Sequence, residues 1–198
     1  MHKDWPLNRG RADIPDELLD DQSGTPFSNC RMCALDLHDP VVPYMVEKVV
    51  RKNLVLGIQE ELFAYAICLG CVSEMKSSIS DESMKVIQQF IAGNQHVQKR
   101  MERVFWGEDL SLETLLGHCM LSAKPVSESV EYQMAALCEG KELILGMWPY
   151  VIDSEMIVKL TSLLSEETLG NMDAFYGQNF GLPPEWADLF KDRPVLWI

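Results

Sequence analysis

The chain contains six cysteines, and four of them form two Cys-x-x-Cys pairs, Cys30/Cys33 and Cys68/Cys71. Two residues between cysteines let one tight turn direct both sulfurs toward a single ion. Four thiolates in two such turns complete the tetrahedral ligand shell of a zinc ion, and soft thiolates exclude hard ions such as magnesium. The spacing therefore predicts one zinc ion held by these four cysteines.

The predicted zinc site has the ligand composition of a structural site. A catalytic zinc has three protein ligands and keeps one position open for water, whereas four thiolates fill the shell. A redox-active Cys-x-x-Cys stands alone after a strand in a β-α-β context, and this chain has two pairs. We therefore expect a closed site that stabilises the fold.

The other residues capable of binding a metal are expected to lie outside this site. His38 follows Cys33 closely and could replace a thiolate, but with four cysteines available we expect a solvated loop residue. His118 and Cys119 are adjacent, and neighbours on a strand point to opposite faces. Cys119 and Cys138 are therefore predicted to be buried core thiols.

Known catalytic motifs are missing from the sequence. It has no phosphate loop, nucleophile elbow, kinase signature or His-Glu-x-x-His motif. We therefore expect a protein without enzymatic activity. An enzyme is the competing interpretation, with Asp153, His118 or Tyr132 in a cleft between the two halves of the chain.

The charge balance argues against nucleic-acid binding. The chain has 17 lysines and arginines against 30 aspartates and glutamates, and its formal net charge is −13 at pH 7. Non-specific affinity for nucleic acid depends on clustered basic residues that neutralise phosphates. Any basic surface would lie around Lys48, Arg51 and Lys52, so a nucleic-acid-binding zinc protein is a second alternative.

No apolar segment of the sequence has the length of a membrane span. Residues 1–15 lack the apolar region of a signal peptide, and residues 62–72 are far shorter than the ~20 residues that cross a bilayer. We therefore expect a cytoplasmic protein with no membrane segment, in which reduced cysteines favour a metal site over disulfides.

The first half of the chain has the pattern of a hairpin followed by helices. Residues 1–28 show no periodicity and are expected to form an extended arm. Residues 42–50 are rich in β-branched side chains and roughly alternate in polarity, and residues 61–67 form a second strand. A helical pattern begins after Cys71, and Ser80 has the chemistry of a helix N-cap.

This order of elements resembles the treble-clef zinc fold, in which one cysteine pair precedes a β-hairpin and a second pair lies at the start of a helix. The resemblance covers residues 28–80. It implies a small α+β unit organised around a structural zinc ion. The hairpin needs long arms, because the two cysteine pairs are further apart than in a usual zinc ribbon.

The second half of the chain repeats the pattern of the first. Residues 65–68 match residues 150–153, and residues 80–84 match residues 165–169, at a constant offset of 85 residues. The matches fall at capping and apolar positions, where a shared fold requires them. The sequence therefore predicts two related β-hairpin/helix units within one α+β protein.

The second unit is predicted to be a metal-free copy of the first. At slightly different offsets Cys33 matches Cys119, and Cys30 matches a position near Leu116. Cys68 matches Asp153, and Cys71 matches Met156. One thiol and one acid cannot form a structural zinc site, so packing must stabilise this copy.

These observations predict an organisation and a function. Residues 1–28 form the arm, residues 29–103 the zinc-binding unit, and residues 104–198 the degenerate copy with an apolar tail, residues 195–198. Such a tail is costly to leave in water, so we expect it to fold back, or to bind a protein partner or a second copy of the chain. We expect a zinc-stabilised protein-interaction or regulatory module.

Overall fold

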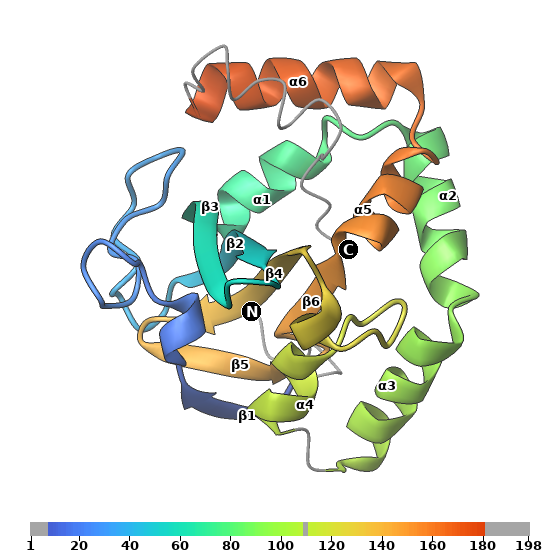
Figure 1. Ribbon diagram of the computed structural model, residues 1–198. Helices are drawn as coiled ribbons and strands as arrows, with labels where there is room; N and C mark the ends of the chain where they lie inside the picture. The colour runs from blue at the N-terminus through green and yellow to red at the C-terminus, as the bar shows by residue number, and fades with distance from the viewer. Residues whose placement is uncertain (1–7, 109–110, 181–198) are drawn as a thin grey trace.

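The protein combines six α-helices with one antiparallel sheet of six strands, which confirms the expected α+β class (Figure 1). This computed structural model describes residues 8–108 and 111–180, and all counts refer to these residues. None of the described helices is long and apolar enough to cross a membrane. The predicted boundaries at residues 28 and 103 are not tested by the fold and stay predictions.

The sheet is built around two long central strands, β2 and β4. Its order is β1-β5-β4-β2-β3, and β6 also pairs with β4. The strands are β1 (Asn8–Asp13), β2 (Pro43–Asn53), β3 (Ile58–Cys68), β4 (Glu131–Glu139), β5 (Glu142–Gly146) and β6 (Tyr150–Asp153).

Three helices follow the β2–β3 hairpin, one helix precedes β4, and two helices follow β6. They are α1 (Leu69–Lys76), α2 (Asp81–Ala92), α3 (Gln95–Trp106), α4 (Leu112–Gly117), α5 (Ser154–Thr161) and α6 (Glu166–Phe180). Two short 3-10 helices cover Asp16–Leu18 and Val126–Glu128. The predicted N-cap is confirmed, because the Ser80 side chain accepts a hydrogen bond from the Ser83 N–H at the start of α2.

The strands predicted for the first half are present and longer than expected. Residues 42–50 lie in or beside β2, and residues 61–67 lie within β3. The predicted arm also contains regular structure, because β1 pairs with β5 from Asn8 to Asp13. This pairing is long-range, so the local sequence pattern gave no sign of it.

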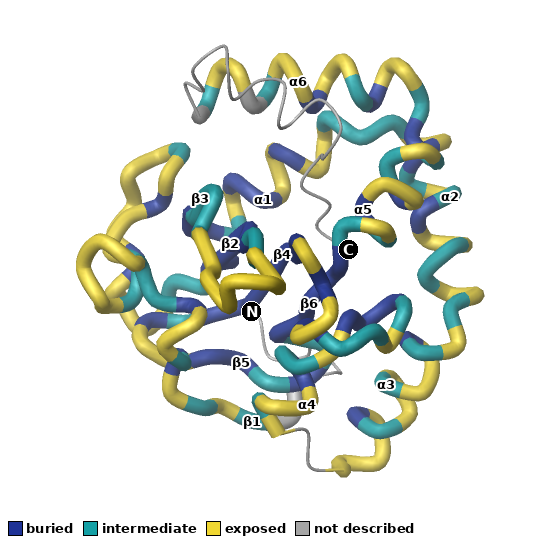
Figure 2. The backbone as a smooth tube through the Cα atoms, in the orientation of Figure 1, coloured by how far each residue is buried: buried dark blue, intermediate teal, exposed yellow. Residues whose placement is uncertain are grey.

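The sheet centre is buried under helices, while the outer helix faces and the β2–β3 turn are exposed (Figure 2). Among the largest buried side chains are Tyr44 and Tyr150. The Tyr44 hydroxyl donates a 2.8 Å hydrogen bond to the Gly140 carbonyl, so even this polar atom is satisfied inside the core.

The N-termini of α2 and α6 contact each other through reciprocal hydrogen bonds. The Ser80 N–H donates to Thr168 Oγ1 at 3.0 Å, and the Ser165 N–H donates to Ser83 Oγ at 2.9 Å. The Ser80 and Ser165 hydroxyls are 3.1 Å apart and are separated by 85 residues in sequence. Unpaired N–H groups at the two helix starts are thus satisfied across this contact.

A carboxyl group lies at the middle of the β2–β4 pair. Glu47 is opposite Ala135 in the register and is fully buried. Its carboxyl accepts hydrogen bonds from the Tyr65 hydroxyl at 2.6 Å and from Gln133 Nε2 at 2.5 Å. Burial raises the pKa of Glu47 well above its usual value, and the bond from Tyr65 only partly opposes this.

Glu47→Gln should therefore change how stability depends on pH. Because the pKa of Glu47 is raised in the folded state, folding retains a proton that the unfolded chain loses above its usual pKa of 4.5. The wild type then becomes less stable as pH rises, by at most about 1.4 kcal/mol per pH unit. Glutamine does not ionise, so urea unfolding between pH 6 and 9 should show a flatter profile for the variant. Parallel profiles would contradict the assignment.

Candidate metal centre

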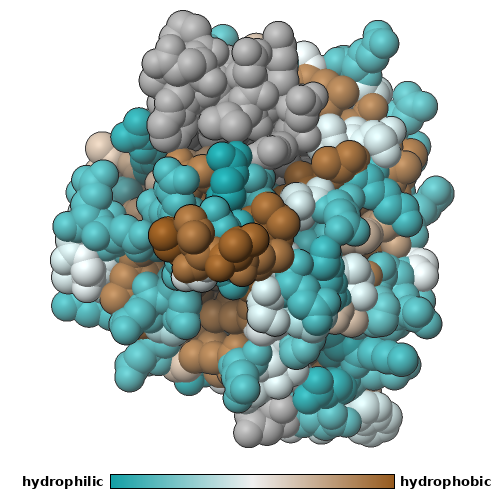
Figure 3. All heavy atoms as spheres, in the orientation of Figure 1, coloured by the Kyte–Doolittle hydropathy of each residue, from teal (hydrophilic) through white to brown (hydrophobic). Residues whose placement is uncertain are grey.

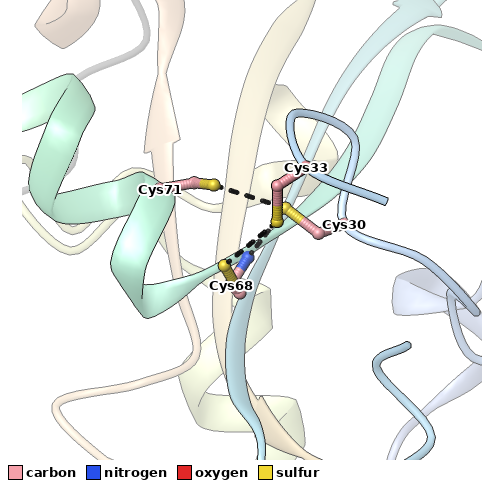
Figure 4. Close-up of side chains that lie close together, drawn as sticks. All are labelled: Cys30, Cys33, Cys68 and Cys71. Carbon is pink, nitrogen blue, oxygen red and sulfur yellow. Dashed lines mark hydrogen bonds between the residues drawn. The ribbon is translucent and has the colours of Figure 1, made fainter. Parts of the chain in front are cut away.

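The four paired cysteines lie together at one end of the β2–β3 hairpin (Figure 4). Cys30 and Cys33 come from the loop before β2, which we call the first knuckle. Cys68 is the last residue of β3, and Cys71 lies in the first turn of α1. Figure 4 shows their sulfurs directed toward a common centre, so the first knuckle and the junction between β3 and α1 meet there.

The separations of the sulfurs fit one tetrahedral ion. Cys30 Sγ lies 3.7 Å from Cys71 Sγ, and Cys33 Sγ lies 3.8 Å from Cys68 Sγ. All four sulfurs lie within 4.8 Å of one another. Zinc–sulfur bonds of about 2.3 Å in a tetrahedron place neighbouring sulfurs about 3.8 Å apart, whereas a disulfide needs about 2.05 Å. The four thiols could therefore hold a metal ion.

Backbone hydrogen bonds fix the shape of the first knuckle. The Cys30 N–H donates to the Leu35 carbonyl at 2.8 Å, and the Ala34 N–H donates to the Cys30 carbonyl at 2.9 Å. The Arg31 N–H donates to the Ala66 carbonyl at 2.8 Å, which attaches the knuckle to β3. The turn is closed by Ala34 in the left-handed region, at φ 58°.

The second cysteine pair is positioned by the start of α1. Cys68 occupies the N-cap position with extended backbone, but its side chain makes no capping hydrogen bond. Its sulfur points to the cluster, and its N–H donates to Cys30 Sγ at 3.3 Å. Cys71 lies three residues on, so one helical turn brings its sulfur beside the other three.

The four thiols differ in burial and in the direction in which their surroundings shift the pKa. Cys30, Cys68 and Cys71 are buried and Cys33 is exposed. Burial alone would raise the pKa of Cys30, but N–H donors from Cys68, Cys33 and Met32 together lower it to about 7. Burial and the neighbouring thiols raise the pKa of Cys71. Each thiolate that forms makes it harder for the neighbouring thiols to lose their protons, because like charges repel. A bound cation is therefore needed to hold four thiolates together.

Other residues considered from the sequence lie outside the cluster. His38 is exposed, with its Nε2 3.5 Å from the Pro26 carbonyl oxygen, as expected for a loop residue. Cys119 and Cys138 are buried, which confirms the prediction of core thiols. Burial raises the pKa of Cys138 to about 12, so this thiol is inert near neutral pH.

Two residues of the enzyme alternative, Tyr132 and Asp153, are neighbours in the sheet, and the Asp153 carboxylate has a capping role. His118 is exposed at the C-terminus of α4, and Tyr132 is opposite Asp153 in the β4–β6 register. The Asp153 carboxylate accepts hydrogen bonds from the Ser122 hydroxyl at 2.5 Å and from the Met156 N–H at 3.0 Å. Burial opposes ionisation of Asp153, but these bonds and Cys119 lower its pKa. Asp153 therefore caps α5.

The hydrogen bonds of the first knuckle recur around Cys119. Its N–H donates to the Lys124 carbonyl at 2.8 Å, and the Ala123 N–H donates to the Cys119 carbonyl at 2.9 Å. The Met120 N–H bonds the Val151 carbonyl at 2.7 Å, attaching this turn to β6. Ala123 also has φ 58°, like its counterpart in the first knuckle.

These contacts correct the expected alignment of the two turns. Cys119 takes the place of Cys30, not of Cys33 as the sequence suggested, and Ser122 takes the place of Cys33. The Asp153 N–H donates to Cys119 Sγ at 3.4 Å, just as the Cys68 N–H bonds the Cys30 sulfur. A cysteine followed four residues later by alanine is common to both turns and could have revealed this.

The basic residues singled out from the sequence do not form an open basic surface. Lys48 is buried, with its Nζ 2.6 Å from Asp21 and 2.8 Å from Glu61. Arg51 pairs with Glu131 at 3.1 Å, and Lys52 lies over the Tyr132 ring. The acidic partners come from distant segments, so local composition could not reveal them.

Comparisons of this chain with protein-family models, with curated proteins and with solved structures found no match. Function is therefore inferred from the four-thiol cluster and from the surfaces that it supports.

Replacing one cysteine of the cluster should remove the metal and destabilise the fold. Cys71→Ser is expected to lower the metal content to near zero and the thermal midpoint by more than about 10 °C, because metal binding contributes folding free energy. The matched control is Cys119→Ser, whose hydroxyl can still accept the Asp153 N–H. Elemental analysis and calorimetry measure both effects. Equal metal content in the two variants would contradict the assignment.

Proposed function

We propose that the chain is a non-enzymatic protein-interaction module whose four paired cysteines hold one structural zinc ion. The observation that carries this proposal is the position of the four-thiol cluster at the base of a hairpin with an apolar, exposed tip. Thiolate ligands and tetrahedral sulfur separations favour zinc over hard divalent ions. Four protein ligands leave no position for a reacting water.

The proposed zinc ion would stiffen the β2–β3 hairpin. The ion would connect the first knuckle to the end of β3 and to α1, and Cys68 is paired with Tyr44 at the base of the hairpin. The two strands stay paired to Asn53 and Ile58 at the other end. A hairpin clamped at its base and paired along its length holds its tip in a fixed position.

The hairpin tip is the contact surface in this proposal. Leu54, Val55, Leu56 and Ile58 are 49%, 93%, 67% and 61% exposed. Figure 3 shows apolar side chains gathered in the region where Figure 1 places the turn between β2 and β3. A cluster of exposed apolar side chains on a rigid element is typical of a protein-binding site. The apolar tail, residues 195–198, lies outside the described residues.

We further propose that the two halves are copies of one treble-clef-like unit, and that the second has lost its metal. Three observations support this. The hydrogen bonds of the first knuckle recur around Cys119, α5 begins and ends 85 residues after α1, and the starts of α2 and α6 bond each other reciprocally. In the second copy, Ser122 and Asp153 would replace two thiolates with a hydrogen bond. The expected cytoplasmic location, where thiols stay reduced, agrees with a metal site.

Restoring three cysteines to the second half tests the proposed duplication. Ser122→Cys/Asp153→Cys/Met156→Cys, together with native Cys119, should raise the zinc content from one to two ions per chain. Ser122→Cys alone is the control and should bind one. The measurement is zinc per folded chain after gel filtration. A triple variant that keeps the near-UV spectrum of the wild type but binds one zinc would refute the equivalence of the two turns.

The contact surface is tested by charging the hairpin tip. Val55→Asp/Leu56→Asp should abolish partner binding while leaving zinc content and thermal midpoint unchanged, because both side chains are exposed. Val158→Asp is the control, since Val158 is 58% exposed on α5. Quantitative affinity capture and sedimentation measure hetero- and self-association. Identical partners and identical mass for all three proteins would rule out the tip as the interface.

A further inference from the structure

An apolar cavity lies between the sheet and helices α1, α2 and α3. Its volume is about 360 Å³, within the range of small-molecule sites, about 300–1,000 Å³. Strands β2, β4, β5 and β6 contribute to one wall and the three helices to another. The described residues of the lining are apolar or aromatic except for Lys76, and include Val72, Val97, Met101, Trp148 and Tyr150.

Methionines make the lining adaptable. Met45, Met101, Met120 and Met147 all face this cavity. Methionine is unbranched and polarisable, so it can repack around ligands of different shape. Trp148 and Tyr150 add flat aromatic surface, and their rings are in contact at a centroid distance of 4.7 Å. Such a lining favours a flexible hydrocarbon over a polar molecule.

Among the described residues of the lining, a single one is charged, the lysine Lys76. Lys76 is exposed in the last turn of α1, and no ion pair within 4.0 Å involves it among the described residues. No acidic side chain of residues 8–108 or 111–180 lines the cavity. This contrasts with the protein as a whole, whose formal net charge is −13. A cation in an otherwise apolar wall favours a ligand with one anionic end.

A second cation, Arg100, contacts the backbone of the segment that carries the lining residues Met147 and Trp148. Arg100 Nη2 donates to the carbonyl of Met147 at 3.0 Å and also to the carbonyl of Pro149. Its Nε is buried without a hydrogen-bond partner, and no carboxylate of the described residues pairs with it. Burial lowers the pKa of Arg100 to about 10, which leaves it charged at neutral pH. A half-buried guanidinium without a carboxylate partner among the described residues makes the local potential positive.

We propose that this cavity binds a small apolar molecule that ends in a carboxylate, of the class of medium-chain fatty acids. The hydrocarbon chain lies among the methionines and Trp148, and the carboxylate pairs with Lys76 at the mouth. Arg100 is a positioning residue: it holds the backbone of residues 147–149 and adds positive potential without touching the ligand.

This binding site is additional to the proposed interaction surface. The hairpin tip contributes no residue to the cavity. Leu69, Val72 and Lys76 lie on α1, whose first turn carries Cys71, so the metal centre also supports one wall. Ligand binding should therefore be measured on the metal-loaded chain, and its failure would leave the interaction proposal intact.

The test is a titration of the full-length, metal-loaded protein with decanoate, followed by calorimetry at pH 7. We expect saturable binding at one site with a Kd in the micromolar range. Lys76→Met should weaken decanoate binding about tenfold and leave binding of the uncharged analogue decanol unchanged. Lys85→Met is the matched control, because Lys85 is exposed on α2 and does not line the cavity.

A second variant tests the location of the site. Met101→Trp fills the mouth of the cavity from a position that is 42% exposed, so the fold should tolerate it. It should weaken binding of decanoate and decanol alike, with an unchanged thermal midpoint. The proposal is overturned if decanoate does not bind up to 1 mM, which would mean that protein fills the cavity. It is also overturned if Lys76→Met and Lys85→Met bind decanoate equally well, or if Met101→Trp has no effect.

Discussion

The cluster of four sulfur atoms brings together two segments of this chain that are distant in sequence, residues 30–33 and residues 68–71. The first knuckle, the end of β3 and the start of α1 meet at sulfur separations that suit a single ion. No disulfide joins the first knuckle to residues 68–71, since all four cysteines are free thiols. The cluster lies at the base of the hairpin, while the pairing of β2 with β4 fixes the hairpin in the sheet.

The second half reaches a similar local geometry with hydrogen bonds alone. Asp153 begins α5 as Cys68 begins α1, but its carboxylate caps the helix and accepts the Ser122 hydroxyl. A buried hydrogen-bond network stabilises only when each member is satisfied, and these donors are all matched. The central β2–β4 pair and the α2–α6 contact join the two halves.

The local features of this fold were predictable and the long-range ones were not. Cysteine spacing predicted the cluster, alternation predicted β2 and β3, and capping chemistry predicted α2 at Ser80. The pairing of β1 with β5 and the burial of Lys48 between Asp21 and Glu61 depend on contacts across the chain. The sequence pattern matched Cys119 with Cys33, and this alignment was wrong. The turn geometry that Ala34 and Ala123 share matches Cys119 with Cys30.

The central claim is that one zinc ion is bound by four sulfurs at the base of the hairpin. Zinc K-edge X-ray absorption on protein purified under reducing conditions without chelator tests this directly. We expect zinc to be surrounded by four sulfurs at about 2.3 Å, with no nitrogen or oxygen ligand. A first shell with oxygen or nitrogen, or a folded protein that contains no zinc, would contradict it.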